Sequence, residues 1–111
     1  MVEHYSKNSV NIEIIDVVYD APFLLGNMFK YMVRTGDKGV DDRAKAIDYA
    51  KRIDTYLDAE DFRLRIKIYK WWHKRIELLV MFSGILEEKG YPPVRRGDDV
   101  FAYINTIANL D

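Results

Sequence analysis

Cysteine is absent from this chain of 111 residues, and only 3 prolines and 6 glycines interrupt it. The missing cysteine excludes disulfides, thiolate chemistry and cysteine-based zinc sites, and it suits a reducing compartment. No apolar run reaches the length of a transmembrane helix, and the first residues lack the apolar segment of a signal peptide. We therefore expect a cytoplasmic protein without a membrane contact.

No sign of charge dominates either, because 17 Lys plus Arg nearly cancel 18 Asp plus Glu and leave a net charge of −1. Such a chain has no overall field for nucleic acid, which is not expected as a main partner, so any anion site must be local. Hydrophobic residues at 49% and aromatic residues at 14% predict a folded chain, and its length fits one domain, residues 1–111.

Apolar residues recur at spacings of three and four along most of the chain, which predicts an all-α bundle of about five helices. The first helix is expected to follow irregular residues 1–10, with Asn11 as its N-cap, and to end near Pro22. Val10, Ile12 and Ile14 also alternate with polar residues, so a brief strand is an alternative for this segment.

Residues 23–52 are expected to form the second and third helices around a short loop with two glycines. Gly36 suits the C-cap of the second helix because glycine adopts positive φ readily, and Asp41 or Asp42 can cap the third. Each helix has a polar face opposite its apolar face. These polar faces carry Asn27, Lys30, Tyr31 and Arg34 on the second helix, and Asp42, Lys45, Asp48, Tyr49 and Arg52 on the third.

Asp58 is a candidate N-cap for a long fourth helix that runs towards Lys89 and stops at the Gly-Tyr-Pro-Pro sequence after it. Strict alternation over residues 62–68 is also typical of a strand, but the acidic start and the Gly-Pro stop favour a helix. The Ser-Gly pair at 83–84 is expected to kink or split this helix. One of the two aspartates at 98–99 then caps a final helix.

Phosphate groups are bound by guanidinium forks, ammonium charges and backbone N–H groups near glycines, and the loop after the second helix can present all three. This chemistry predicts a phosphate site at Lys30, Arg34, Lys38, Gly39 and Lys45. The alternative is that these cations are solvated or paired with aspartates of the third helix, while the glycines only end a helix.

Carboxylates near this loop offer a way to hold Mg²⁺ together with the phosphates of a nucleotide. The candidates are Asp16, Asp41, Asp42 and Asp48. No G-x-x-x-x-G-K-[ST] loop is present to position a metal nucleotide, and the E-x-x-E pair of an all-α nucleotide pyrophosphohydrolase is missing. We therefore do not expect hydrolysis of that type, and no residue is assigned as a metal ligand.

Four short motifs follow one another in the first half of the chain. They are His4-Tyr5, Ile12-Glu13-Ile14-Ile15-Asp16, Gly26-Asn27-x-x-Lys30-Tyr31-x-x-Arg34-x-Gly36-x-Lys38-Gly39, and Asp42-x-x-Lys45-Ala46-x-x-Tyr49. Together, over residues 4–53, they resemble a bacteriophage family of small proteins mostly labelled as having unknown function. One branch of that family, in podoviruses infecting enteric bacteria, is a nucleotide kinase that lacks a P-loop. Residues 58–111 depart from the family pattern and form a divergent helical extension.

The resemblance implies a nucleotide-binding, kinase-like protein in the cytoplasm of an infected host cell. It implies catalytic roles for Lys30, Arg34 and His4, and it places Asn27 and Tyr31 against the sugar or base. Phosphoryl transfer would then depend on positioning and charge neutralisation, with Mg²⁺ arriving on the nucleotide.

The basic and aromatic segment 63–75 is typical of surfaces for single-stranded nucleic acid, but a buried Trp72 with cations on a wet helix face explains it as well. Trp71 and Trp72 point to different parts of the helix surface, so both are not expected in one core, and one would cover a partner or homo-oligomer contact. With the Arg95-Arg96 loop, they predict an interface. The alternative function is therefore a non-enzymatic early phage protein that binds and modulates a host protein.

Overall fold

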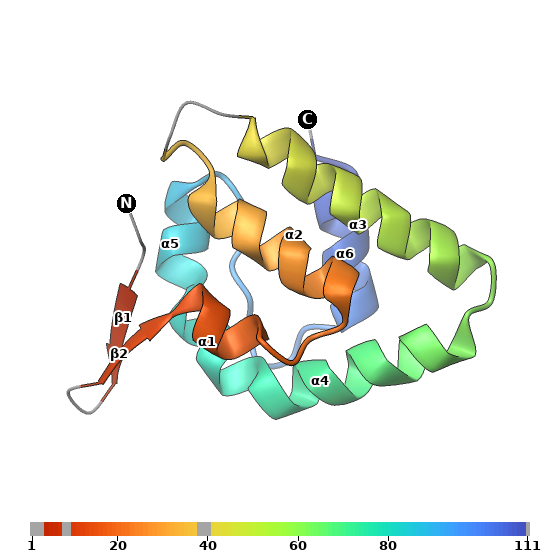
Figure 1. Ribbon diagram of the computed structural model, residues 1–111, viewed down its shortest axis with the longest axis horizontal. Helices are drawn as coiled ribbons and strands as arrows, with labels where there is room; N and C mark the ends of the chain where they lie inside the picture. Colours follow the sequence, from red (N-terminus) through yellow and green to blue (C-terminus); the bar gives the residue numbers. More distant parts are fainter. Residues whose placement is uncertain (1–3, 8–9, 38–40, 111) are drawn as a thin grey trace.

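Helices surround one hydrophobic core in the computed structural model, which describes residues 4–7, 10–37 and 41–110 (Figure 1). The fold is mostly helical, which confirms the predicted class. In the described residues the elements are β1 His4–Lys7, β2 Val10–Glu13, α1 Ile14–Val18, α2 Phe23–Arg34, α3 Asp42–Asp58, α4 Phe62–Met81, α5 Ser83–Glu88 and α6 Val100–Ala108. None of the helices in these segments is long and apolar enough to cross a bilayer.

A two-stranded antiparallel hairpin precedes the helices, with His4 opposite Glu13 and Lys7 opposite Val10. Figure 1 shows it projecting beside α1. The backbone N–H of Glu13 donates to Asp16 Oδ2 at 2.9 Å in a reciprocal capping box that starts α1. A helix start at Asn11 was therefore wrong, and the strand alternative holds for 10–13, because pairing with β1 satisfies the backbone of this segment.

Helices α2 and α3 lie side by side as an antiparallel pair (Figure 1). Gly36 has a φ of +82°, which confirms the predicted glycine at the end of α2. Asp41 caps α3, since its Oδ1 accepts from the backbone N–H of Ala44 at 3.1 Å.

The predicted cap at Asp58 was wrong, because α3 continues through that residue. The chain then turns at Ala59 and Glu60, where Glu60 adopts a φ of +62°, a conformation that side chains other than glycine rarely take. Asp61 caps α4 by accepting from the backbone N–H of Leu64 at 2.9 Å. The helix prediction over residues 62–68 is confirmed.

The long predicted fourth helix is split at Phe82 into α4 and α5, as the Ser-Gly pair indicated. Ser83 Oγ donates to the carbonyl of Val94 at 2.8 Å and accepts from its N–H at 2.9 Å, so a hydrogen-bonded crosslink stabilises the break. Asp99 caps α6 by accepting from the backbone N–H of Phe101 at 3.0 Å.

Aromatic rings from three helices meet in the core. The Phe29 ring of α2 lies 6.1 Å from Tyr103 of α6 and 6.3 and 6.4 Å from Trp71 and Trp72 of α4, measured between centroids. Both tryptophans are at most 5% exposed, so the expectation that only one could enter the core was wrong. Both fit because α4 is covered on two sides, by the α1–α2 connection at Trp71 and by α6 at Trp72.

Candidate functional site

Three cations surround one tyrosine ring on the polar face shared by α2 and α3. Lys30 Nζ lies 4.5 Å from the centroid of the Tyr31 ring, Lys45 Nζ lies 5.3 Å from it, and Arg34 Cζ lies 5.4 Å from it. The same ring stacks on Tyr49 of α3, with centroids 5.8 Å apart and planes at 10°. We call Lys30, Tyr31, Arg34 and Lys45 the tyrosine–cation cluster. Cation–π contact holds its charges together without neutralising them.

A buried carboxylate lies beneath this cluster. Asp42 is only 1% exposed, with Arg34 Nε 3.5 Å from its Oδ2 and Lys45 Nζ 3.9 Å from its Oδ1. Neither carboxylate oxygen accepts a hydrogen bond from the described residues. One negative charge thus offsets part of the three positive charges, and the ends of Arg34 and Lys45 remain about half exposed, at 42% and 53%.

A small hollow adjoins the cluster at the amino-terminal end of α2. It encloses about 210 Å³ between α1 and α2, and Tyr19, Phe23, Asn27 and Lys30 are among the residues that line it. The Phe23 ring is 73% exposed and meets Tyr49 edge-on at 6.4 Å. Because ligand sites of drug size start at about 300 Å³, this hollow fits a base or a sugar but not a whole nucleotide.

The backbone just after α2 is held by the second half of the chain. Lys89 Nζ donates to the carbonyl of Thr35 at 2.8 Å and to Asp37 Oδ1 at 2.6 Å, and the Thr35 and Tyr91 hydroxyls are 2.6 Å apart. Burial raises the pKa of Tyr91 despite this contact with Thr35, so its phenol stays protonated at neutral pH. Residues 35–37 are thereby fixed where the predicted phosphate loop begins.

The structure brings some of the predicted site residues together and leaves others apart. Lys30, Tyr31, Arg34 and Lys45 meet, and Asn27 lies one turn before Lys30 and donates through Nδ2 to the carbonyl of Phe23 at 2.8 Å. That bond leaves the Asn27 amide oxygen and one N–H for another partner. Lys38 and Gly39 lie outside the described residues. The backbone of His4 is in β1, and its side chain lies outside the described part.

The alternative that aspartates pair with these cations is confirmed for Arg34 and Lys45, which both face Asp42. Asp48 instead pairs with Arg52 at 2.9 Å.

The aspartates proposed for Mg²⁺ do not form a site in the described residues. Asp16 and Asp41 accept hydrogen bonds at helix starts, Asp48 binds Arg52, and Asp42 is paired beneath the cluster. No three carboxylate or imidazole side chains gather as a metal ion would need, within the segments that the structure describes. These residues therefore do not fit a metal held by the protein itself.

The predicted partner interface was wrong for its two tryptophans, because both are buried. Trp71 and Trp72 are core residues, at most 5% exposed, and the indole N–H of Trp71 donates to Asp20 Oδ1 at 3.1 Å, so neither is the exposed interface ring that was predicted. Arg95 and Arg96 are exposed, and Arg96 forms a two-pronged pair with Glu77 at 2.8 Å. Only the arginines remain as candidates for that surface.

Two features of the site were missed in the sequence. Phe23 precedes Asn27 by four residues, so the same helical period that aligned Asn27, Lys30 and Arg34 also aligns Phe23. The burial of Asp42 had no local signal, because it depends on how α2 covers the start of α3.

Comparison with known proteins gives one match. Residues 2–51 match the model of a family described as a protein of unknown function, DUF3310. No curated protein and no solved structure matches the chain. The matched segment contains the whole tyrosine–cation cluster, Asp42 and the hollow at Phe23.

Proposed function

We propose that the chain binds a nucleotide across the α2–α3 face, with phosphates on the tyrosine–cation cluster and the base or sugar in the hollow at Phe23. The observation that carries this proposal is the gathering of Lys30, Arg34 and Lys45 around one ring beside that hollow. Lys30 belongs to both features, so one ligand with a polyphosphate and a ring can contact both.

The chemistry of the cluster suits phosphate. Arg34 offers a guanidinium fork for two oxygens, and the two lysines add point charges that need no fixed geometry. One face of Tyr31 lies against Tyr49, so its part in binding is to hold the cations and to present its hydroxyl. Phe23 is a largely exposed ring that lines the hollow, and Asn27 supplies an amide beside it.

A kinase-like activity in an infected host cell is the further proposal that the phage-family resemblance supports. In that mechanism Arg34, Lys30 and Lys45 hold the phosphates in line and neutralise their charge, and Mg²⁺ comes bound to the nucleotide. The alternative of a host-protein binder loses its main argument, because both tryptophans are buried.

A thermal-shift screen with nucleoside mono-, di- and triphosphates, with and without Mg²⁺, tests the proposal, because a ligand that binds only the native state raises the melting temperature. Arg34→Ala should abolish the shift without unfolding the protein. Arg96→Ala is the matched control, since it removes another exposed, ion-paired arginine far from the cluster along the chain and should keep the shift. Full shifts with Arg34→Ala would contradict the site.

Inorganic pyrophosphate, which has no base, tests the tyrosine–cation cluster separately from the hollow at Phe23. Phe23→Ala should weaken nucleotide binding about tenfold, because stacking of a base on an aromatic ring contributes roughly 1–3 kcal/mol. It should leave pyrophosphate binding unchanged, whereas Arg34→Ala weakens both. If Phe23→Ala weakened nucleotide and pyrophosphate binding equally, the base would not bind in the hollow.

A further inference from the structure

Helix α4 presents two parallel strips to solvent. The cationic strip has spacings of four, three and four residues and consists of Arg63, Lys67, Lys70 and Lys74. The aromatic strip has the same spacings, one residue earlier, and consists of the rings of Phe62, Tyr69 and His73 with Ile66 between them. Phe62 is 64% exposed and Tyr69 is 54% exposed. At about 1.5 Å per residue each strip runs for roughly 16 Å along the helix.

Charge is concentrated on this one helix. Its six Lys or Arg residues and single Glu give α4 a formal charge of +5, so the rest of the chain, with the total at −1, carries −6. Screening in physiological salt limits the reach of a charge to about 8 Å, so a ligand at α4 meets the helix and not the average of the chain. The nearly balanced composition therefore does not exclude a polyanion.

Much of that charge is not paired within the fold. Arg75 and Lys74 share Asp20 at 2.7 and 3.1 Å, and Arg65 lies over the Phe101 ring at 4.7 Å. Arg63, Lys67 and Lys70 have no acidic partner among residues that the structure describes. They are exposed and lie on consecutive turns.

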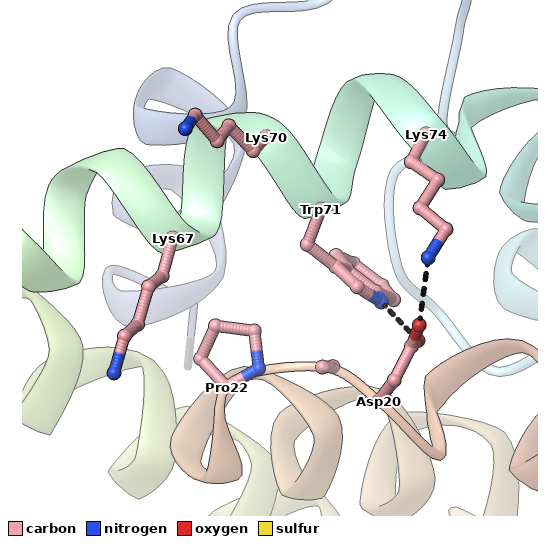
Figure 2. A pocket seen from close by; sticks show the side chains of 7 residues that line it. Asp20, Pro22, Lys67, Lys70, Trp71 and Lys74 are labelled. Atoms are coloured by element: carbon pink, nitrogen blue, oxygen red, sulfur yellow. Dashed lines mark hydrogen bonds and ion pairs between the residues drawn. The ribbon is translucent and has the colours of Figure 1, made fainter.

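A cavity of about 490 Å³ borders the cationic strip, between α4 and the α1–α2 connection. Figure 2 shows Lys67 extending beside Pro22, the ammonium of Lys74 meeting Asp20, and Lys70 pointing away from that connection. Asp20 is already engaged by Trp71, Lys74 and Arg75, so the unpaired charge at this cavity is positive.

We propose that the outer face of α4 binds single-stranded nucleic acid, with backbone phosphates along the cationic strip and unpaired bases on the rings of the aromatic strip. Cations beside exposed rings are the combination that binds single strands without sequence preference. A duplex hides its base faces, so it offers the rings of Phe62 and Tyr69 nothing to stack on. This surface is separate from the tyrosine–cation cluster and does not depend on the function proposed for it.

The test is fluorescence anisotropy of a labelled 20-nucleotide oligo(dT) with the full chain between 50 and 200 mM salt. Three to four phosphate contacts predict a slope of about −2 to −3 in a plot of log affinity against log salt, from roughly −0.7 per contact. Lys67→Glu with Lys70→Glu should weaken binding at least tenfold and flatten the slope by about 1.4. Lys51→Glu with Arg95→Glu makes the same charge change on other exposed positions and should cost less than threefold.

Phe62→Ala with Tyr69→Ala tests the rings and should weaken oligo(dT) binding at least about thirtyfold with an unchanged salt slope, because two stacked bases lose their rings. All substituted side chains are exposed, so circular dichroism should show native helix content in each variant. Equal losses in the two charge-reversal variants, no effect of the ring substitutions, or no oligo(dT) binding at 50 mM salt would each overturn the proposal. Tighter binding to anionic vesicles, to a poly-glutamate peptide or to duplex DNA than to oligo(dT) would overturn it as well.

Discussion

Replacing Asp42 by asparagine should tighten the binding of phosphate groups at the tyrosine–cation cluster. Asparagine has nearly the shape of aspartate, so the substitution removes a buried negative charge and leaves the packing of α2 on α3 intact. In the wild-type protein that charge faces Arg34 and Lys45 at 3.5 and 3.9 Å and competes with any bound anion for these two cations. Its oxygens accept no hydrogen bond from the described residues, so the substitution breaks no described hydrogen bond and only releases Arg34 and Lys45 from their ion pairs.

The size of the effect follows from distance. A phosphate oxygen that accepts a hydrogen bond from the outer side of Arg34 would lie about 7 Å from the Asp42 carboxylate. This distance adds a hydrogen bond of roughly 3 Å to the separation between Arg34 and Asp42. Two unit charges at that separation repel by roughly 1 kcal/mol for an effective dielectric constant of about 40. This corresponds to about a fivefold lower Kd for Asp42→Asn.

Isothermal titration of pyrophosphate into the wild-type protein and Asp42→Asn measures this change, at about 0.02 M and 0.15 M salt because screening should reduce it. Asp48→Asn is the matched control, since Asp48 is 58% exposed and pairs with Arg52 instead, and its Kd should change less than twofold. Weaker pyrophosphate binding by Asp42→Asn would show that Asp42 positions Arg34 for the ligand, and the competition argument would be refuted.

Two further predictions concern stability. Burial acts to raise the pKa of Asp20, but hydrogen bonds from Lys74, Arg75 and Trp71 hold this pKa below the usual 3.8. The ionised carboxylate therefore stabilises the fold above pH 3.8, and this contribution is lost as the pH falls through the folded-state pKa. Melting curves should therefore show Asp20→Asn less stable than wild type at pH 7, with the difference shrinking below pH 3.8, and a constant difference would contradict this account. Lys89→Met should lower the free energy of unfolding in urea by about 3 kcal/mol, because it leaves the mostly buried Asp37 unpaired, and a loss under 1 kcal/mol would contradict that.

Local signals predicted most of the helical fold. Periodic apolar residues gave the helices. Side-chain chemistry gave the glycine at the end of α2 and limited two caps to a pair of aspartates each, of which the structure uses Asp41 and Asp99, because each signal depends on contacts within a few residues. The hairpin was missed because β1, His-Tyr-Ser-Lys, shows no strong alternation, and its pairing with β2 is a contact that no single window contains. The position of the turn at Glu60 was missed because its positive φ occurs at a residue that does not favour it.

The site was only partly predictable for the same reason. Asn27, Lys30 and Arg34 share a face by helical spacing alone, so their alignment could be read from the sequence. The approach of Lys45 to the Tyr31 ring and the burial of Asp42 are set by the packing of α3 on α2. The burial of both tryptophans likewise depends on which helices flank α4, and spacing along α4 alone led to the wrong expectation.

The family match and the structural unit have different boundaries. The match ends at residue 51, inside α3, which continues to Asp58. The apolar side of α2 packs on α4 and α6 through Phe29, and the segment after α2 is held by Lys89. Residues 58–111 are therefore needed to bury the back of the helix that carries the tyrosine–cation cluster, whatever further role they have. The exposed face of α4, where that helix concentrates its charge, takes no part in this burial.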